Sequence, residues 1–275
     1  MKRISRKADV SSEALVNDTT VIESGVRIEE DVRIGYNAVI RENVHIRRGT
    51  FVGDNVVLGE RLSEYYRNPK DYENPRLEIG RNSVIRSGSI LYAGSVFGEG
   101  FQTGCSVVVR EKSRFGMNNN LGTLSQVEGY NEIGDHNRFH CAVHLPFMTK
   151  IHNYVWVFPY VVFTTDLHPP CGDCIRGPEI EDYALVGTQS VVMPGVKIGR
   201  GAIIGAQSLV TRDVTPETVV IGIPAKPVKN IRDIECTEIP GHPRPYPWFE
   251  TMSPERKKKY GYDRTCGKRL KRERH

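Results

Sequence analysis

Histidine is the chemically informative residue in the middle of this chain of 275 residues. Five of its eight histidines lie within 33 residues, and they are His136, His140, His144, His152 and His168. A free imidazole has a pKa of about 6.5, so it can take a proton at neutral pH and act as a general base. This concentration of histidines indicates a site rather than a solvated face.

The cysteines form a second pattern, but it does not indicate a catalytic or metal site. Six cysteines in a chain of this length do not form a disulfide scaffold, so we expect reduced thiols. Cys171 and Cys174 have the spacing of metal ligands, and His168 is nearby in the sequence. A lone pair of this kind lacks a fourth ligand, so we predict two loop thiols and no metal.

The element that must position these side chains is a repeat of six residues. Reading every sixth residue over 16–58, 79–163 and 180–210 gives 29 positions, of which 28 are apolar. At 39% hydrophobic residues, chance would supply about 11. Glycine follows directly at 12 of the 29 positions. A period of six fits a short strand and a tight turn, and we expect glycine to permit the turn.

Such strands would stack coil on coil with the apolar ladder pointing inward. Three repeats per coil give about ten coils and a column about 45 Å tall, with strands spaced about 4.8 Å apart. The sequence therefore predicts an all-β fold, a parallel β-helix, rather than an open sheet or a helical bundle.

Two runs near the end of the repeat carry a family resemblance. Residues 198–206 read Ile-Gly-Arg-Gly-Ala-Ile-Ile-Gly-Ala, and residues 222–227 read Gly-Ile-Pro-Ala-Lys-Pro. The second run resembles the segment that ends the β-helix of acetyl-CoA-dependent hexapeptide-repeat acyltransferases. The resemblance covers roughly residues 16–230. It implies a left-handed β-helix, acetyl-CoA as co-substrate, and a homotrimer with grooves between adjacent copies.

Two breaks in the repeat predict extruded loops at residues 59–78 and 164–179. Long loops on a rigid scaffold often carry function. Loops in these two places resemble the layout of N-acetyltransferases that act on nucleotide-linked amino-deoxysugars, although Thr165 stands where that pattern usually has Asn. We predict a β-helix domain over residues 1–230 and a C-terminal extension over residues 231–275.

Acyl transfer needs a base for the attacking group, donors for the oxyanion and a held thioester. With the resemblance, these needs suggest His140 or His144 as the base and Asp166 or His168 as the residue that orients the acceptor. Some related enzymes use no side-chain base and let the departing thiolate take the proton. In that case these histidines bind substrate.

The resemblance also implies where coenzyme A lies. It points to the last coils, with Gly187, Gly205 and Ala206 along the pantetheine and with Arg212 or Lys226 near the 3′-phosphate. A cationic side chain is a suitable phosphate partner.

Net charge and hydropathy exclude other classes. Residues 252–275 hold ten Lys/Arg and three Asp/Glu, so the rest of the chain carries −2 of the total charge of +5. A basic tail on a near-neutral body does not indicate a nucleic-acid-binding domain, and we expect a solvated tail. No apolar run approaches the ~20 residues of a membrane span, and no apolar segment follows the basic start. We expect a cytoplasmic protein.

The favoured function is therefore acetyl-CoA-dependent N-acylation of a nucleotide-linked amino sugar. O-acetylation of a sugar or another small molecule is the first alternative. A γ-type carbonic anhydrase shares the coil, but it needs two histidines five residues apart and a third two coils earlier. Here His140 and His144 are four apart and no histidine lies two coils before them. A non-catalytic assembly subunit is the remaining alternative.

Overall fold

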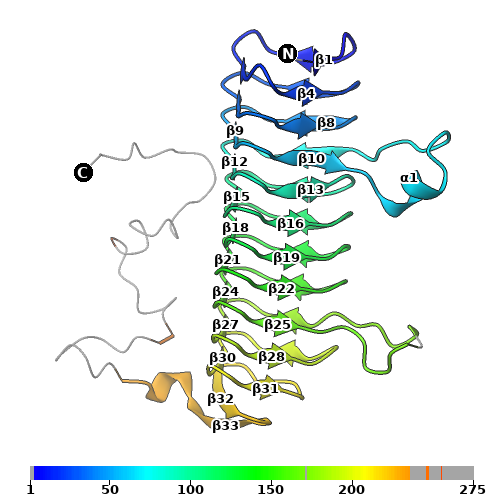
Figure 1. The fold of residues 1–275 in the computed structure, drawn as a ribbon. Helices are drawn as coiled ribbons and strands as arrows, with labels where there is room; N and C mark the ends of the chain where they lie inside the picture. The colour runs from blue at the N-terminus through cyan, green and yellow to red at the C-terminus, as the bar shows by residue number, and fades with distance from the viewer. Residues whose placement is uncertain (1–2, 171, 236–245, 248–254, 256–275) are drawn as a thin grey trace.

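The chain winds into a three-sided column of parallel strands (Figure 1). The structure is a computed structural model, and it describes residues 3–170, 172–235, 246–247 and 255. Successive strands take the three sides in turn, so that each strand pairs with the strand three places later in the chain. This arrangement is an all-β solenoid, consistent with a left-handed parallel β-helix, and the predicted fold class is confirmed.

Sheet A is the side from which both loops leave. It contains eleven parallel strands, and its register aligns residues 18 apart wherever no loop intervenes. Its strands, in spatial order, are β1 (Arg3–Ile4), β4 (Val21–Ile22), β7 (Val39–Ile40), β10 (Val57–Glu60), β13 (Ile90–Tyr92), β16 (Val108–Val109), β19 (Gln126–Val127), β22 (His144–Leu145), β25 (Val162–Phe163), β28 (Val191–Val192) and β31 (Leu209–Val210).

Sheet B is the second side, and it receives the chain after each loop. It contains ten strands. They are β2 (Asp9–Val10), β5 (Arg27–Ile28), β8 (Val44–Ile46), β11 (Leu77–Ile79), β14 (Val96–Phe97), β17 (Arg114–Phe115), β20 (Glu132–Ile133), β23 (Lys150–Ile151), β26 (Glu179–Ile180) and β29 (Lys197–Ile198).

Sheet C is the third side, and it ends differently from the other two. Its last strand, β33, runs antiparallel to β32. The twelve strands are β3 (Leu15–Val16), β6 (Arg33–Ile34), β9 (Phe51–Val52), β12 (Val84–Ile85), β15 (Gln102–Thr103), β18 (Asn120–Leu121), β21 (Arg138–Phe139), β24 (Trp156–Val157), β27 (Leu185–Val186), β30 (Ile203–Ile204), β32 (Thr218–Gly222) and β33 (Ala225–Asn230).

The core consists of the predicted ladder, which is the row of mostly apolar residues spaced six apart in the sequence. From Ile22 to Val210 its side chains are buried, and they form one continuous hydrophobic cluster along the axis. Thr103 is the polar member of the ladder, and its hydroxyl accepts a hydrogen bond from the backbone N–H of Arg86 at 2.9 Å. The ladder also begins earlier than residue 16. Ile4 and Val10 continue the same step of six in β1 and β2, so the column is longer than the repeat read from the sequence.

Glycine has a different role from the one expected. Apart from Gly59 (φ 80°), the glycine after each inward residue does not have the left-handed backbone. That conformation occurs two residues later, for example at Asn37 (φ 53°) after Gly35 and at Gly201 (φ 66°) after Gly199. At Gly187, a Cβ would lie 2.7 Å from the backbone nitrogen of Ala206 in the next coil. These glycines therefore allow close stacking of coils.

The two loops leave the column at the same edge, between sheets A and B (Figure 1). The first connects β10 to β11 and contains the short helix α1 (Ser63–Arg67), which the sequence pattern did not predict. The second connects β25 to β26. Five strand steps of sheet A separate β10 from β25, which is about 24 Å at ~4.8 Å per step.

After β33 a 3-10 helix, η1 (Ile231–Asp233), follows, and the bond from the Arg232 Nε to the Glu217 carboxylate at 2.8 Å ties it to the last coil. Most of the predicted C-terminal extension, including its basic tail, lies outside the described residues. Cys171 also lies outside them, so the predicted thiol pair is represented only by Cys174, a free cysteine.

Candidate active site at one corner of the column

Four of the predicted site residues share one corner, which we call the C–A corner because the chain there passes from sheet C to sheet A. His140 follows β21, Gly187 follows β27, and Gly205 and Ala206 follow β30. Backbone hydrogen bonds join successive levels, from His140 N to Val157 O at 2.8 Å and from Gly187 N to Ile204 O at 2.9 Å. The β-helix thus brings residues 65 positions apart in sequence into one column.

The side chain of His140 lies in an aromatic cluster at this corner. Its ring stacks on Phe158 with centroids 5.0 Å apart and planes 9° apart, and Trp156 lies 6.3 Å away. Burial, together with the nearby charge of Arg138, lowers the pKa of His140 below its usual value. The imidazole is therefore neutral at neutral pH, as a general base must be before it acts.

Two nitrogen atoms in this cluster are buried without a hydrogen-bond partner among the described residues. They are Nε2 of His140 and Nε1 of Trp156. Buried polar atoms are nearly always paired in folded proteins, so an unpaired one calls for a partner that the chain does not supply. A ligand that carries both a donor and an acceptor would satisfy the two atoms.

A cation lies over the same cluster. Arg138 pairs with Trp156 across β21 and β24, and its guanidinium carbon lies 5.2 Å from the centroid of the Trp156 ring. Along the corner, His140 and Phe158 present rings, whereas Gly187 and Gly205 present bare backbone. The corner therefore offers flat faces and a positive charge near His140, and half-buried glycine backbone near Gly187 and Gly205.

His144 lies on another surface. It is half-buried on the outer face of sheet A, where its strand neighbours are Gln126 and Val162. Val162 belongs to β25, the strand from which the second loop departs, so His144 lies beside the base of that loop. No hydrogen bond joins His144 to His140 in the described part of the chain.

Asp166 and His168 lie in the second loop. Asp166 forms an isolated bridge with Ile175, and its carboxylate accepts a hydrogen bond from the backbone N–H of His168 at 2.9 Å. The side chain of His168 is exposed and that of Asp166 is half-buried. Asp166 therefore shapes the turn that presents His168 to solvent.

Arg212 and Lys226 lie at the end of the column. Arg212 follows β31, while Lys226 lies in β33 opposite Ile221 of β32. Both side chains are exposed. They belong to the same last coils as Gly205 and Ala206.

Trp156, Phe158 and Arg138 are site residues that the sequence reasoning missed. A signal for one of them was present, because Phe158, like His140, stands in the position that glycine takes at Gly122 and Gly187 of the same corner. A large ring at a position that glycine often takes distinguishes these two levels of the corner from the others. Within the described ranges, no group of three His, Cys, Asp or Glu side chains could hold a metal ion.

The sequence of the coils matches a known family. The model of the bacterial transferase hexapeptide (six repeats) matches residues 25–60 and 177–212, the second of which includes Gly187, Gly205 and Ala206. These two segments are therefore similar in sequence to hexapeptide-repeat transferases. They lie at both ends of the column, and the three-sided winding continues unbroken between them.

The curated relatives that this chain resembles are named as acetyltransferases. The chain is 36% identical over 88 residues to a chloramphenicol acetyltransferase of Escherichia coli, a match that covers 28% of this chain and 40% of the relative. It is 44% identical over 59 residues to a 2,3,4,5-tetrahydropyridine-2,6-dicarboxylate N-acetyltransferase of Staphylococcus aureus, covering 22% of this chain and 25% of the relative. The chain thus spans less than half the length of these relatives.

Among solved structures, a hexapeptide-repeat acetyltransferase from Vibrio cholerae is 27% identical with a TM-score of 0.34, covering 38% of this chain and 64% of that one. In the described part of the chain, no helix has the length and apolar character needed to cross a membrane.

Proposed function

We propose that this protein is an acetyl-CoA-dependent N-acyltransferase that acts on the amino group of a nucleotide-linked amino sugar. The proposal rests mainly on His140 at the C–A corner. Its pKa is lowered, its Nε2 has no hydrogen-bond partner among the described residues, and it lies on the same corner as Gly187 and Gly205. The acetyltransferase names of the relatives support the reaction class.

In the proposed reaction the amine nitrogen attacks the thioester carbonyl, and the carbon–sulfur bond then breaks. His140 takes the proton that the amine loses, and the thiolate of coenzyme A leaves. Nε2 of His140 is suited to this role because no other described residue occupies it. His144 is the alternative base, and it would act on an acceptor that lies across the sheet A face.

The choice of a nucleotide-linked acceptor follows from the composition of the corner. The rings of Trp156 and Phe158 offer flat faces for a base or a sugar, and the guanidinium of Arg138 is a partner for a diphosphate. In the second loop, Asp166 and His168 would orient the sugar that carries the amine.

Coenzyme A would follow the last coils. We place the pantetheine along Gly187, Gly205 and Ala206, and the exposed Arg212 and Lys226 suit the 3′-phosphate. We place this catalytic unit in residues 1–230, with residues 231–275 as an extension, and we expect a homotrimer in the cytoplasm whose clefts are shared between copies.

The test is thiol release from acetyl-CoA, measured against a panel of nucleotide-linked amino sugars and their hydroxyl counterparts. Saturable release with amino sugars alone supports the proposal. Release with hydroxyl acceptors alone would replace it with O-acetylation. If neither acceptor promotes release and calorimetry detects no coenzyme A binding, the acyltransferase assignment is wrong.

A further inference from the structure

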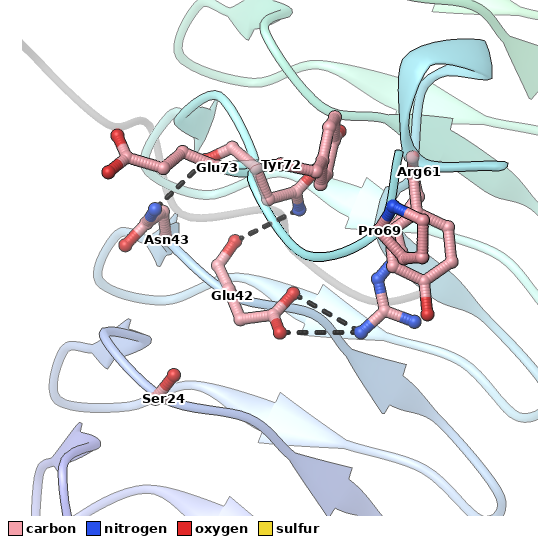
Figure 2. A pocket seen from close by; sticks show the side chains of 9 residues that line it. Ser24, Glu42, Asn43, Arg61, Pro69, Tyr72 and Glu73 are labelled. Atoms are coloured by element: carbon pink, nitrogen blue, oxygen red, sulfur yellow. Dashed lines mark hydrogen bonds and ion pairs between the residues drawn. The ribbon is translucent and has the colours of Figure 1, made fainter. Parts of the chain in front are cut away.

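A cavity of about 410 Å³ lies at the root of the first loop (Figure 2). It is far from the C–A corner along the column. Its walls come from α1 and the loop on one side and from the turns after β4 and β7 on the other. The volume is within the range of about 300–1,000 Å³ typical of small-molecule sites. This cavity has no role in the proposed acyl transfer.

The cavity has firm walls because one buried asparagine ties the loop to the coils. Asn74 is 5% exposed, and its side-chain amide donates to the backbone oxygens of Glu42 (3.2 Å) and Gly59 (2.9 Å). The hydroxyl of Tyr72 donates to the Asn74 side-chain oxygen at 2.6 Å, and the side-chain amide of Asn43 donates to the Asn74 backbone oxygen at 2.9 Å. The pocket is therefore formed before any ligand arrives.

Charge is fixed inside the cavity by Arg61. Its Nη2 lies 3.2 Å from the carboxylate of Glu23 and 3.3 Å from that of Glu42, and its guanidinium carbon lies 4.4 Å from the centroid of the Tyr65 ring. Burial and the neighbouring Glu42 raise the pKa of Glu23 above its usual value. Glu73 also lines the cavity, so acidic groups outnumber the guanidinium there and an anionic ligand is disfavoured.

The cavity lining has both hydrogen-bond donors and acceptors that can bind a ligand. All hydrogen bonds that Arg61 makes with described residues run through Nη2, which leaves its other guanidinium nitrogens to donate elsewhere. The hydroxyls of Ser24 and Tyr65 can donate or accept, while the carboxylate of Glu42 accepts. A surface that both donates and accepts at short range fits hydroxyl groups, because each hydroxyl does both.

We propose that this cavity binds a sugar unit, neutral or amine-bearing, as a site separate from the acyl-transfer corner. The separation is large. Sheet A rises by five strands from β7, next to the cavity, to β22, next to His140, which is about 24 Å at ~4.8 Å per strand. A single sugar cannot reach both places, so occupancy here does not depend on the proposed acyl transfer.

The test uses the whole chain and three probes: D-glucose, D-glucosamine and D-glucose 6-phosphate. Saturation-transfer NMR and calorimetry should detect saturable binding of the first two with Kd near 1 mM, and binding of the phosphate about tenfold weaker or worse. Ser24→Phe, which fills the cavity, and Tyr65→Ala, which removes a wall, should each weaken binding about tenfold or more. Tyr130→Ala is the matched control, since Tyr130 is an exposed tyrosine outside the cavity.

The result that overturns the proposal is clear. The absence of saturable binding of every probe would refute the sugar-site proposal. The proposal would also be wrong if Trp156→Phe abolished binding while Ser24→Phe left it unchanged, because the sugar would then lie at the C–A corner. Thermal unfolding of each variant separates loss of binding from loss of folding. Acetyl transfer by Ser24→Phe should match the parent chain, so failure of the acyltransferase proposal would be seen separately.

Discussion

The ring of His140 lies nearly parallel to that of Phe158, one coil away, while Nε2 of His140 has no hydrogen-bond partner among the described residues. Stacking holds the imidazole in place without using the nitrogen that would carry out the chemistry. The same contact helps to bury the ring, and burial keeps it neutral.

Replacing His140 by Ala should lower kcat for acetyl transfer about 100-fold, because the attacking group loses its proton acceptor. Steady-state kinetics with the best acceptor measures the change. His144→Ala is the matched variant on the sheet A face. If His144→Ala loses kcat while His140→Ala changes only KM, then the base is His144, and if neither changes kcat, the departing thiolate takes the proton.

The pH dependence of kcat/KM should reflect the lowered pKa of His140. A free histidine titrates at about pH 6.5, so the acidic limb should lie below that value and the rate should be flat through neutral pH. Stability should change in the same window. The unfolded chain binds the proton first, so the free energy of unfolding should fall as pH drops below about 6.5. An acidic limb above pH 6.5 would contradict this assignment.

Trp156→Phe removes the unpaired N–H and keeps an aromatic ring. If that N–H donates to the acceptor substrate, KM for the acceptor should rise about five- to tenfold, in line with a lost hydrogen bond of about 1 kcal/mol. The KM for acetyl-CoA is the internal control and should stay unchanged. Equal KM values for acceptor in the variant and the parent chain would mean that the N–H faces another partner.

Gly187→Ala should destabilise the last coils. The added methyl would lie 2.7 Å from the backbone nitrogen of Ala206 and 2.7 Å from the backbone oxygen of Ile204, and neither atom can move without shifting a coil. We expect a loss of about 1–3 kcal/mol, measured by denaturant unfolding. Thr211→Ala, at an exposed position nearby, should change stability by less than about 0.5 kcal/mol. A neutral Gly187→Ala would mean that the coils are more loosely stacked than described.

The fold could be predicted because one period controls it. A buried aliphatic residue at every sixth position predicts stacked coils of short strands, and the outward face of His144 follows from its place before Leu145. The first coils of the column are less clearly marked by the sequence pattern. Ile4 is 38% exposed at the open end, so burial does not mark it as a member of the core.

The candidate site could be predicted only in part. Position in the repeat places His140 at a turn edge, but the stacking of His140 on Phe158 depends on which residues meet one coil apart. The repeat of six does not determine where side chains on the loops lie. The cavity beside Arg61 exists because Asn74 folds the first loop back onto the coils, and nothing in a repeat of six encodes that bond.

The reversed strand β33 has a consequence for assembly. A stack of open strand edges invites another molecule to continue it, and proteins of this shape must prevent such growth. At the final coil, the chain folds back and pairs β33 against β32 in the opposite direction, so a further copy placed end to end would meet a mismatched partner on sheet C. The reversed strand thus opposes end-to-end addition of a second copy along sheet C.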